Sequence, residues 1–92
     1  MGHLMQMKVI VKGDVQGVGF RFATKHRANE LHLTGFVRNL LDGSVEIMAQ
    51  GRKEDLEELL RHLMQRFRIG EMKPVFQEID QTEAMKSFEI VR

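Results

Sequence analysis

The stretch FVRNLLDGSVEIMAQ (residues 36–50) decides the predicted fold of this 92-residue chain. Two strand-like runs, FVRNL and SVEIMAQ, flank Asp42 and Gly43, and both of these residues tolerate the positive φ that a tight hairpin turn needs. The second run alternates, so one of its faces is expected to point into the core; that face consists of Val45, Ile47 and Ala49. The stretch therefore predicts a β-hairpin with one buried face.

The clearest helix of the chain follows this hairpin. Its apolar side chains recur with the spacing of one helix face, at Leu56, Leu59, Leu60, Leu63, Met64 and Phe67. Acidic residues crowd its start and arginines lie toward its end, which is the polarity that the helix dipole favours. Gly70 and Pro74 are expected to stop it. Apolar residues around positions 75–79 and 88–90 then predict one or two closing strands.

Two further elements precede the hairpin. Alternating apolar residues predict a half-buried strand over residues 7–13, and helix-favouring residues extend over about 20–32. The order is thus β-α-β-β-α-β, with a probable extra C-terminal strand. This order predicts an α+β sandwich of the ferredoxin-like kind, in which two helices cover one face of a mostly antiparallel sheet.

Composition limits the class of protein. Ninety-two residues, 42% of them apolar and 29% charged, fit one compact globular domain. Fourteen Lys and Arg against thirteen Asp and Glu leave a net charge of +1, so we expect neither nucleic acid nor a membrane as a partner. No apolar run reaches the roughly 20 residues of a membrane span. A cytoplasmic, monomeric protein is therefore expected.

The predicted domain covers residues 7–92. Residues 1–6 are expected to be an N-terminal extension left from expression, with Met5 or Met7 as the natural start. The chain has no cysteine, which excludes disulfides and thiolate metal sites. No spacing typical of metal ligands joins its histidines, which are His3, His26, His32 and His62. We therefore predict no metal site.

The segment GDVQGVGFR (residues 13–21) connects the first strand to the first helix. Gly17 and Gly19 allow several successive N–H groups to converge on one oxyanion, and the start of the helix adds unsatisfied N–H groups of its own. Arg21 is placed to bind the same anion. The glycines alone favour a simple tight turn, and the segment matches neither the Walker loop nor the dinucleotide-binding fingerprint. Five residues separate Val15 from Arg21, which is the spacing of a phosphate loop that begins with a nucleophilic cysteine and ends with an arginine. Because the first position is valine here, a phosphocysteine intermediate is excluded.

Together with GFVRNLLDGSVE (residues 35–46), this segment resembles the two signature segments of the acylphosphatase family. The resemblance implies hydrolysis of the carboxyl–phosphate bond of small acyl phosphates to a carboxylate and inorganic phosphate, without a metal or organic cofactor. It implies that Arg21 binds the phosphate and that Asn39 orients the attacking water. It also implies a substrate-binding cradle of main-chain N–H groups, formed by Gln16, Gly17, Val18, Gly19 and Phe20.

Other interpretations of these residues remain open at the level of sequence. Asn39 on its own is as typical of a residue that satisfies turn backbone. Arg38 points to the opposite side of a regular strand and is expected to be a surface or packing group rather than a ligand. Asp14 departs from the basic residue that the family often has there, which places a negative charge near the predicted anion site. A non-catalytic anion-binding module is the main alternative function; a single-stranded RNA binder is disfavoured because the central strands lack stacking aromatics.

Overall fold

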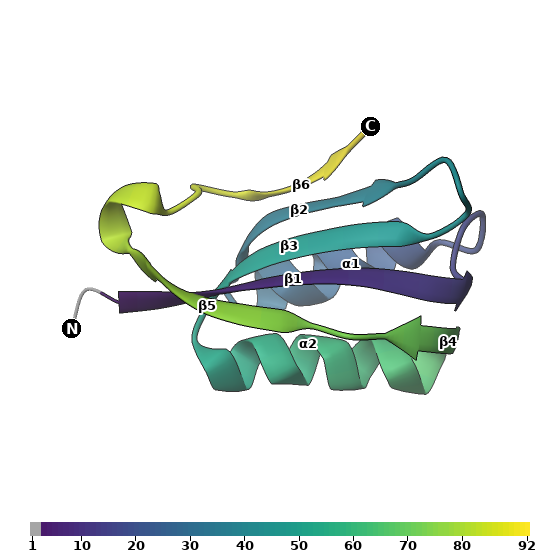
Figure 1. Cartoon of the computed structure of the whole chain (residues 1–92), viewed down its shortest axis with the longest axis horizontal. Coiled ribbons are helices and arrows are strands. Elements are labelled where there is room, and N and C mark those ends of the chain that lie inside the picture. The colour runs from purple at the N-terminus through teal and green to yellow at the C-terminus, as the bar shows by residue number, and fades with distance from the viewer. Residues whose placement is uncertain (1–2) are drawn as a thin grey trace.

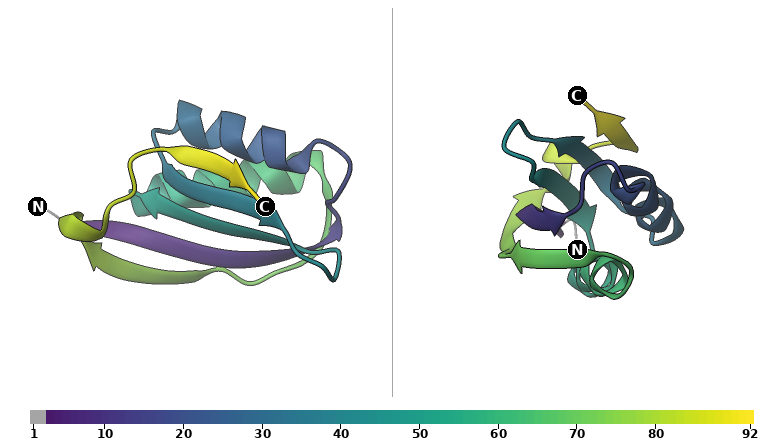
Figure 2. Two further views of the ribbon diagram at one scale, coloured as in Figure 1. Left: turned by 90° about the horizontal axis from the view of Figure 1, so that it is seen from above. Right: turned by 90° about the vertical axis from the view of Figure 1, so that its right-hand side faces the viewer.

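The computed structural model describes residues 3–92 and places two helices against one face of a six-stranded sheet (Figures 1 and 2). The elements are β1 His3–Asp14, α1 Phe20–Glu30, β2 Thr34–Asn39, β3 Val45–Gly51, α2 Lys53–Arg66, β4 Arg68–Met72, β5 Val75–Asp80, the 3-10 turn η1 Gln81–Glu83 and β6 Phe88–Val91. This arrangement confirms the predicted ferredoxin-like fold. None of the helices within the described residues is long and apolar enough to cross a membrane.

The strands lie in the order β4-β1-β3-β2-β6, and β5 also pairs with β1. All pairings are antiparallel except that of β2 with β6. The strands β4 and β5 follow one another along the same edge of β1, separated by Lys73 and Pro74. Proline has no N–H to donate to a ladder, which accounts for the break. The strand β4 was not predicted, because residues 68–72 were assigned to the end of the preceding helix and its connection.

The core lies between the sheet and the two helices. Val45, Ile47 and Ala49 are fully buried, which confirms the predicted inward face of β3. The leucines of α2 pack against this face, and the ring of Phe67, just beyond α2, meets that of Phe20 edge to face with centroids 5.0 Å apart. The start of α1 is thereby fixed against the end of α2.

Three details differ from the sequence prediction. The first strand begins at His3, so that residues 3–6 pair within the sheet instead of lying outside the folded unit. The first helix ends at Glu30, because His32 takes a left-handed φ of 60° that a helix cannot continue through. Met64 is 57% exposed although it was predicted on the buried face. Eight residues of helix turn it about 80° away from Leu56, which places it at the rim of the apolar face.

Candidate active site

One end of the sheet brings together segments that are distant in sequence. The antiparallel pairing of β1 with β3 sets Val11 opposite Val45, and Val45 in turn lies opposite Asn39 at the end of β2. Because β6 runs parallel to β2, Val91 lies opposite Arg38. The ends of β1, β2 and β6 and the start of α1 therefore meet at this end of the sheet, on the right in Figure 1.

The loop from β1 to α1 has the alternation in the sign of φ that is typical of anion-binding nests. Gly17 and Gly19 have φ values of 75° and 82°, whereas Val18 between them has a negative φ. Such an alternation turns successive N–H groups toward one concavity. Within residues 3–92 the N–H groups of residues 16–20 donate to no acceptor, and the first helical hydrogen bond of α1 runs from Ala23 N to Gly19 O at 3.0 Å. Gly19, the N-cap, has no side chain to compete for these donors.

The side chain of Gln16 links this loop to the β2–β3 hairpin. Its Nε2 donates to the carbonyl oxygens of Leu40 and Ser44, at 2.8 Å each. The sequence predicts a role only for the main chain of Gln16, because no local pattern indicates that its side chain bonds to the hairpin. The contact holds the loop at a fixed position relative to Asn39, which precedes Leu40.

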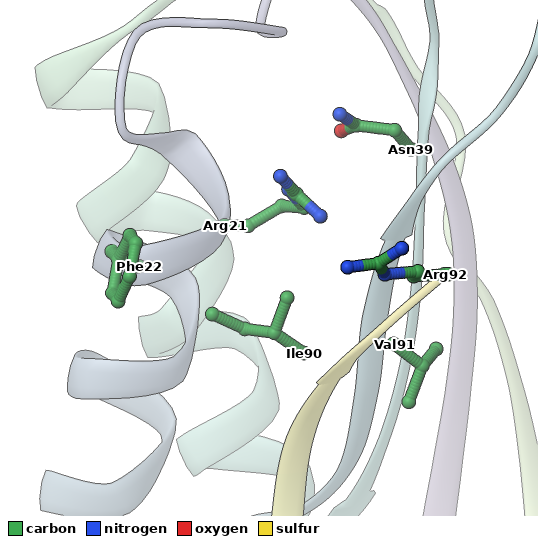
Figure 3. A pocket seen from close by; sticks show the side chains of 6 residues that line it. All are labelled: Arg21, Phe22, Asn39, Ile90, Val91 and Arg92. Carbon is green, nitrogen blue, oxygen red and sulfur yellow. The ribbon is translucent and has the colours of Figure 1, made fainter.

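Arg21 and Asn39 line one cavity of about 560 Å³. Figure 3 shows their side chains directed into the same space, between the first turn of α1 and the end of β2. The remaining lining residues are Phe22, Ile90, Val91 and Arg92. None of the loop residues 16–20 is among the residues that line this cavity, and the ring of Phe20 is buried in the core. The N–H groups of the loop therefore do not form part of the cavity wall.

Asn39 contains a buried acceptor without an internal partner. Its Oδ1 is inaccessible to solvent and accepts no hydrogen bond from residues 3–92. A buried amide oxygen of this kind is costly to leave unpaired in a protein that binds nothing there. The observation fits an amide that turns toward the cavity when it hydrogen-bonds to a water or a ligand there.

Several neighbouring residues have structural partners instead. Arg38 Nε contacts Glu46 Oε1 at 2.6 Å, and its guanidinium lies 5.9 Å from the centre of the Phe36 ring, which confirms its predicted place at the surface. The hydroxyl and backbone N–H of Ser44 donate to the Asp42 carboxylate, and these hydrogen bonds lower the pKa of Asp42 below its ordinary value. Asp42 thus belongs to the turn, as predicted.

Asp14 lies at the outer edge of this region. Its side chain is exposed, and its cross-strand neighbour in β4 is Arg68. An opposite charge directly across a ladder is favourable, although the two side chains form no ion pair in the structure. Among residues 3–92 no group of three or more His, Cys, Asp or Glu side chains is placed to hold a metal ion.

The fold and this cavity define an α+β sandwich with an anion-binding geometry at the start of its first helix. A family model described as acylphosphatase matches residues 7–90. The acylphosphatase of Acaryochloris marina is 36% identical over 92 residues, covering 100% of this chain and 99% of that protein. That of Thermus thermophilus is 40% identical over 85 residues, covering 92% and 97%.

Solved structures agree with these sequence similarities. The crystal structure of the acylphosphatase from Bacillus subtilis matches with a TM-score of 0.84 and 33% identity, over 96% of this chain and 99% of that one. The chain belongs to the acylphosphatase family. This confirms the resemblance of its two sequence segments and the expected class of enzyme, a hydrolase of acyl phosphates.

Proposed function

We propose that this chain hydrolyses small acyl phosphates at the cavity between α1 and the end of β2, with Arg21 and Asn39 as its catalytic residues. The observation that carries the proposal is the pair formed by the Arg21 guanidinium and the unpartnered buried Oδ1 of Asn39 in one cavity. A cation beside an oriented acceptor is what attack of water on a phosphoryl group requires.

Arg21 and the loop would hold the phosphoryl group. The main-chain N–H groups of residues 16–20 and the start of α1 supply neutral donors, and the guanidinium supplies charge-assisted ones. These donors stabilise the charge on the phosphoryl oxygens as the bond to the acyl oxygen breaks. The leaving group is a carboxylate, which is stable without a proton, so no general acid is needed.

Asn39 would orient the attacking water. Because Oδ1 is closed to solvent in the structure, the amide would turn about its last side-chain torsion to bring this oxygen to the cavity. There Oδ1 would accept a hydrogen bond from the water and direct the oxygen lone pair toward phosphorus. A neutral amide is a poor base, so the proton of the water passes to a phosphoryl oxygen. The new P–O bond forms as the bond from phosphorus to the acyl oxygen breaks, and the products are a carboxylate and inorganic phosphate.

Release of phosphate from benzoyl phosphate, measured with a chelator present, tests this proposal. We expect Arg21→Ala and Asn39→Ala each to lower kcat by about 100-fold or more, the scale for removal of a dedicated charge-stabilising or orienting contact. Arg38→Ala is the matched control, because this arginine adjoins Asn39 in sequence but pairs with Glu46 outside the cavity.

Two results would contradict the proposal. Full activity of both cavity variants would show that the chemistry takes place elsewhere. Binding of inorganic phosphate by the parent protein, without turnover of any acyl phosphate, would favour the alternative of an anion-binding module. Thermal unfolding of each variant must be measured alongside, so that loss of folded protein is not taken for loss of a catalytic group.

A further inference from the structure

The cavity contains a second arginine that the proposed chemistry does not use. Arg92 follows β6, and Figure 3 shows its side chain extending from the end of that strand toward Arg21. Neither arginine forms an ion pair with a carboxylate among residues 3–92. Two guanidinium groups in one cavity repel each other, so an anionic ligand that contacts both gains more than one that contacts a single group.

The apolar part of the cavity suggests where the acyl group lies. Phe22 and Ile90 line the space below Arg21, and Arg92 lies across from them (Figure 3). Phe22 is 76% exposed, which is unusual for a phenylalanine and leaves its ring free to cover an apolar group. An acyl chain that leaves the phosphoryl group at Arg21 would run along this wall.

Resting on the proposed function, we infer that Arg92 is a specificity residue for acyl phosphates that have a second anionic group on the acyl part. The phosphoryl group contacts Arg21 and the loop, the acyl carbons lie against Phe22 and Ile90, and the distal carboxylate or phosphate pairs with Arg92. The cavity of about 560 Å³ is in the size range of sites that enclose a small molecule rather than one phosphoryl group.

The test compares three substrates with the same reacting centre: benzoyl phosphate, 4-carboxybenzoyl phosphate and 4-phosphonobenzoyl phosphate. The parent protein is expected to prefer the two para-substituted anions, as judged by kcat/KM. In Arg92→Gln the preference for them over benzoyl phosphate should fall about threefold to tenfold, mainly through KM, as expected for a partly exposed charged contact. Arg92→Lys should keep part of the preference, because it keeps the charge. Whichever of the two substrates, the carboxylate or the phosphonate, loses more of its kcat/KM relative to benzoyl phosphate carries the kind of group that Arg92 recognises.

The control is Lys86→Gln, which removes an exposed positive charge that is outside the cavity. An equal loss of preference in this variant would mean that net charge, not Arg92, attracts the anion, and would overturn the inference. An unchanged preference for the para-substituted anions in Arg92→Gln would also overturn the inference. If the parent still hydrolyses benzoyl phosphate, that result leaves the proposed function intact. A parent that hydrolyses none of the three substrates overturns the proposed function and this inference with it.

Discussion

Replacement of Gln16 by methionine tests whether the contact between the two loops positions the site. Methionine has nearly the same length and removes both hydrogen bonds from Nε2 to Leu40 O and Ser44 O. Each such bond contributes about 0.5–1.5 kcal/mol net. Both carbonyls keep a second donor, since Gly43 N donates to Leu40 O at 3.2 Å and Leu40 N donates to Ser44 O at 2.8 Å. The penalty for an orphaned acceptor is therefore avoided, and the loss of stability should be about 1–3 kcal/mol.

The effect on activity should exceed what this loss of stability explains. Without the contact, the loop with its N–H groups is free to shift relative to Asn39, and small displacements of reacting groups are costly in rate. We expect kcat/KM for benzoyl phosphate to fall about tenfold at a temperature where Gln16→Met is fully folded. The two measurements are urea denaturation for the free energy of unfolding and initial rates of phosphate release.

Gln50→Met is the matched control. Gln50 makes comparable bonds, donating to Gln6 Oε1 at 2.8 Å and accepting from Met85 N at 2.7 Å, but at the opposite end of β3. It should lose at least as much stability, because Met85 N loses its acceptor, and it should retain kcat/KM. Equal losses of kcat/KM in the two folded variants would refute a positioning role for Gln16, and an unchanged free energy of unfolding in Gln16→Met would refute the energetic estimate.

Two further substitutions test the framework around the site. Gly35→Ala should lower the free energy of unfolding by at least about 3 kcal/mol, because the new methyl group would collide with the backbone of Met48 at a φ of 139°; Gly43→Ala, where the space is open, should cost less in the same urea titration. In Asp42→Asn, stability should decrease less between neutral and acid pH than it does in the parent protein. The lowered pKa of Asp42 stabilises the fold at neutral pH, and this contribution is lost as the pH falls below about 4. The measurement is the melting temperature of parent and variant between pH 7 and pH 3. If both decline in parallel, the stabilising contribution of the Asp42 carboxylate is contradicted.

Local patterns predicted most of the fold. The hairpin and the second helix were readable because alternation and helical spacing reflect burial against one core, and Val45 and Leu56 are indeed fully buried. The strand β4 was missed for the converse reason. It lies at an edge where none of its side chains is fully buried, it contains Gly70, and its register with β1 shifts between Lys12 and Gly13. Such a strand depends on its neighbour's hydrogen bonds, and these leave no period in the sequence.

The candidate site was predictable only where its signal is local. Glycines with positive φ before a helix, followed by an arginine, form a recognisable segment, and the resemblance to a family added Asn39. The side-chain role of Gln16 and the presence of Arg92 depend instead on pairing between remote strands. Arg92 enters the cavity because β6 runs parallel to β2, so that both strands end beside the start of α1. No spacing along the chain expresses that pairing.

The net charge of +1 does not show that some arginines have carboxylate partners while others have none. Arg27 pairs with two glutamates between the helices, Arg38 with Glu46 and Arg52 with Glu54. Arg21 and Arg92 have no such partner within the described residues, and they lie beside the positive end of α1 and a loop of free N–H groups. A near-neutral protein can therefore place uncompensated positive charge beside one cavity, where it attracts a small anion.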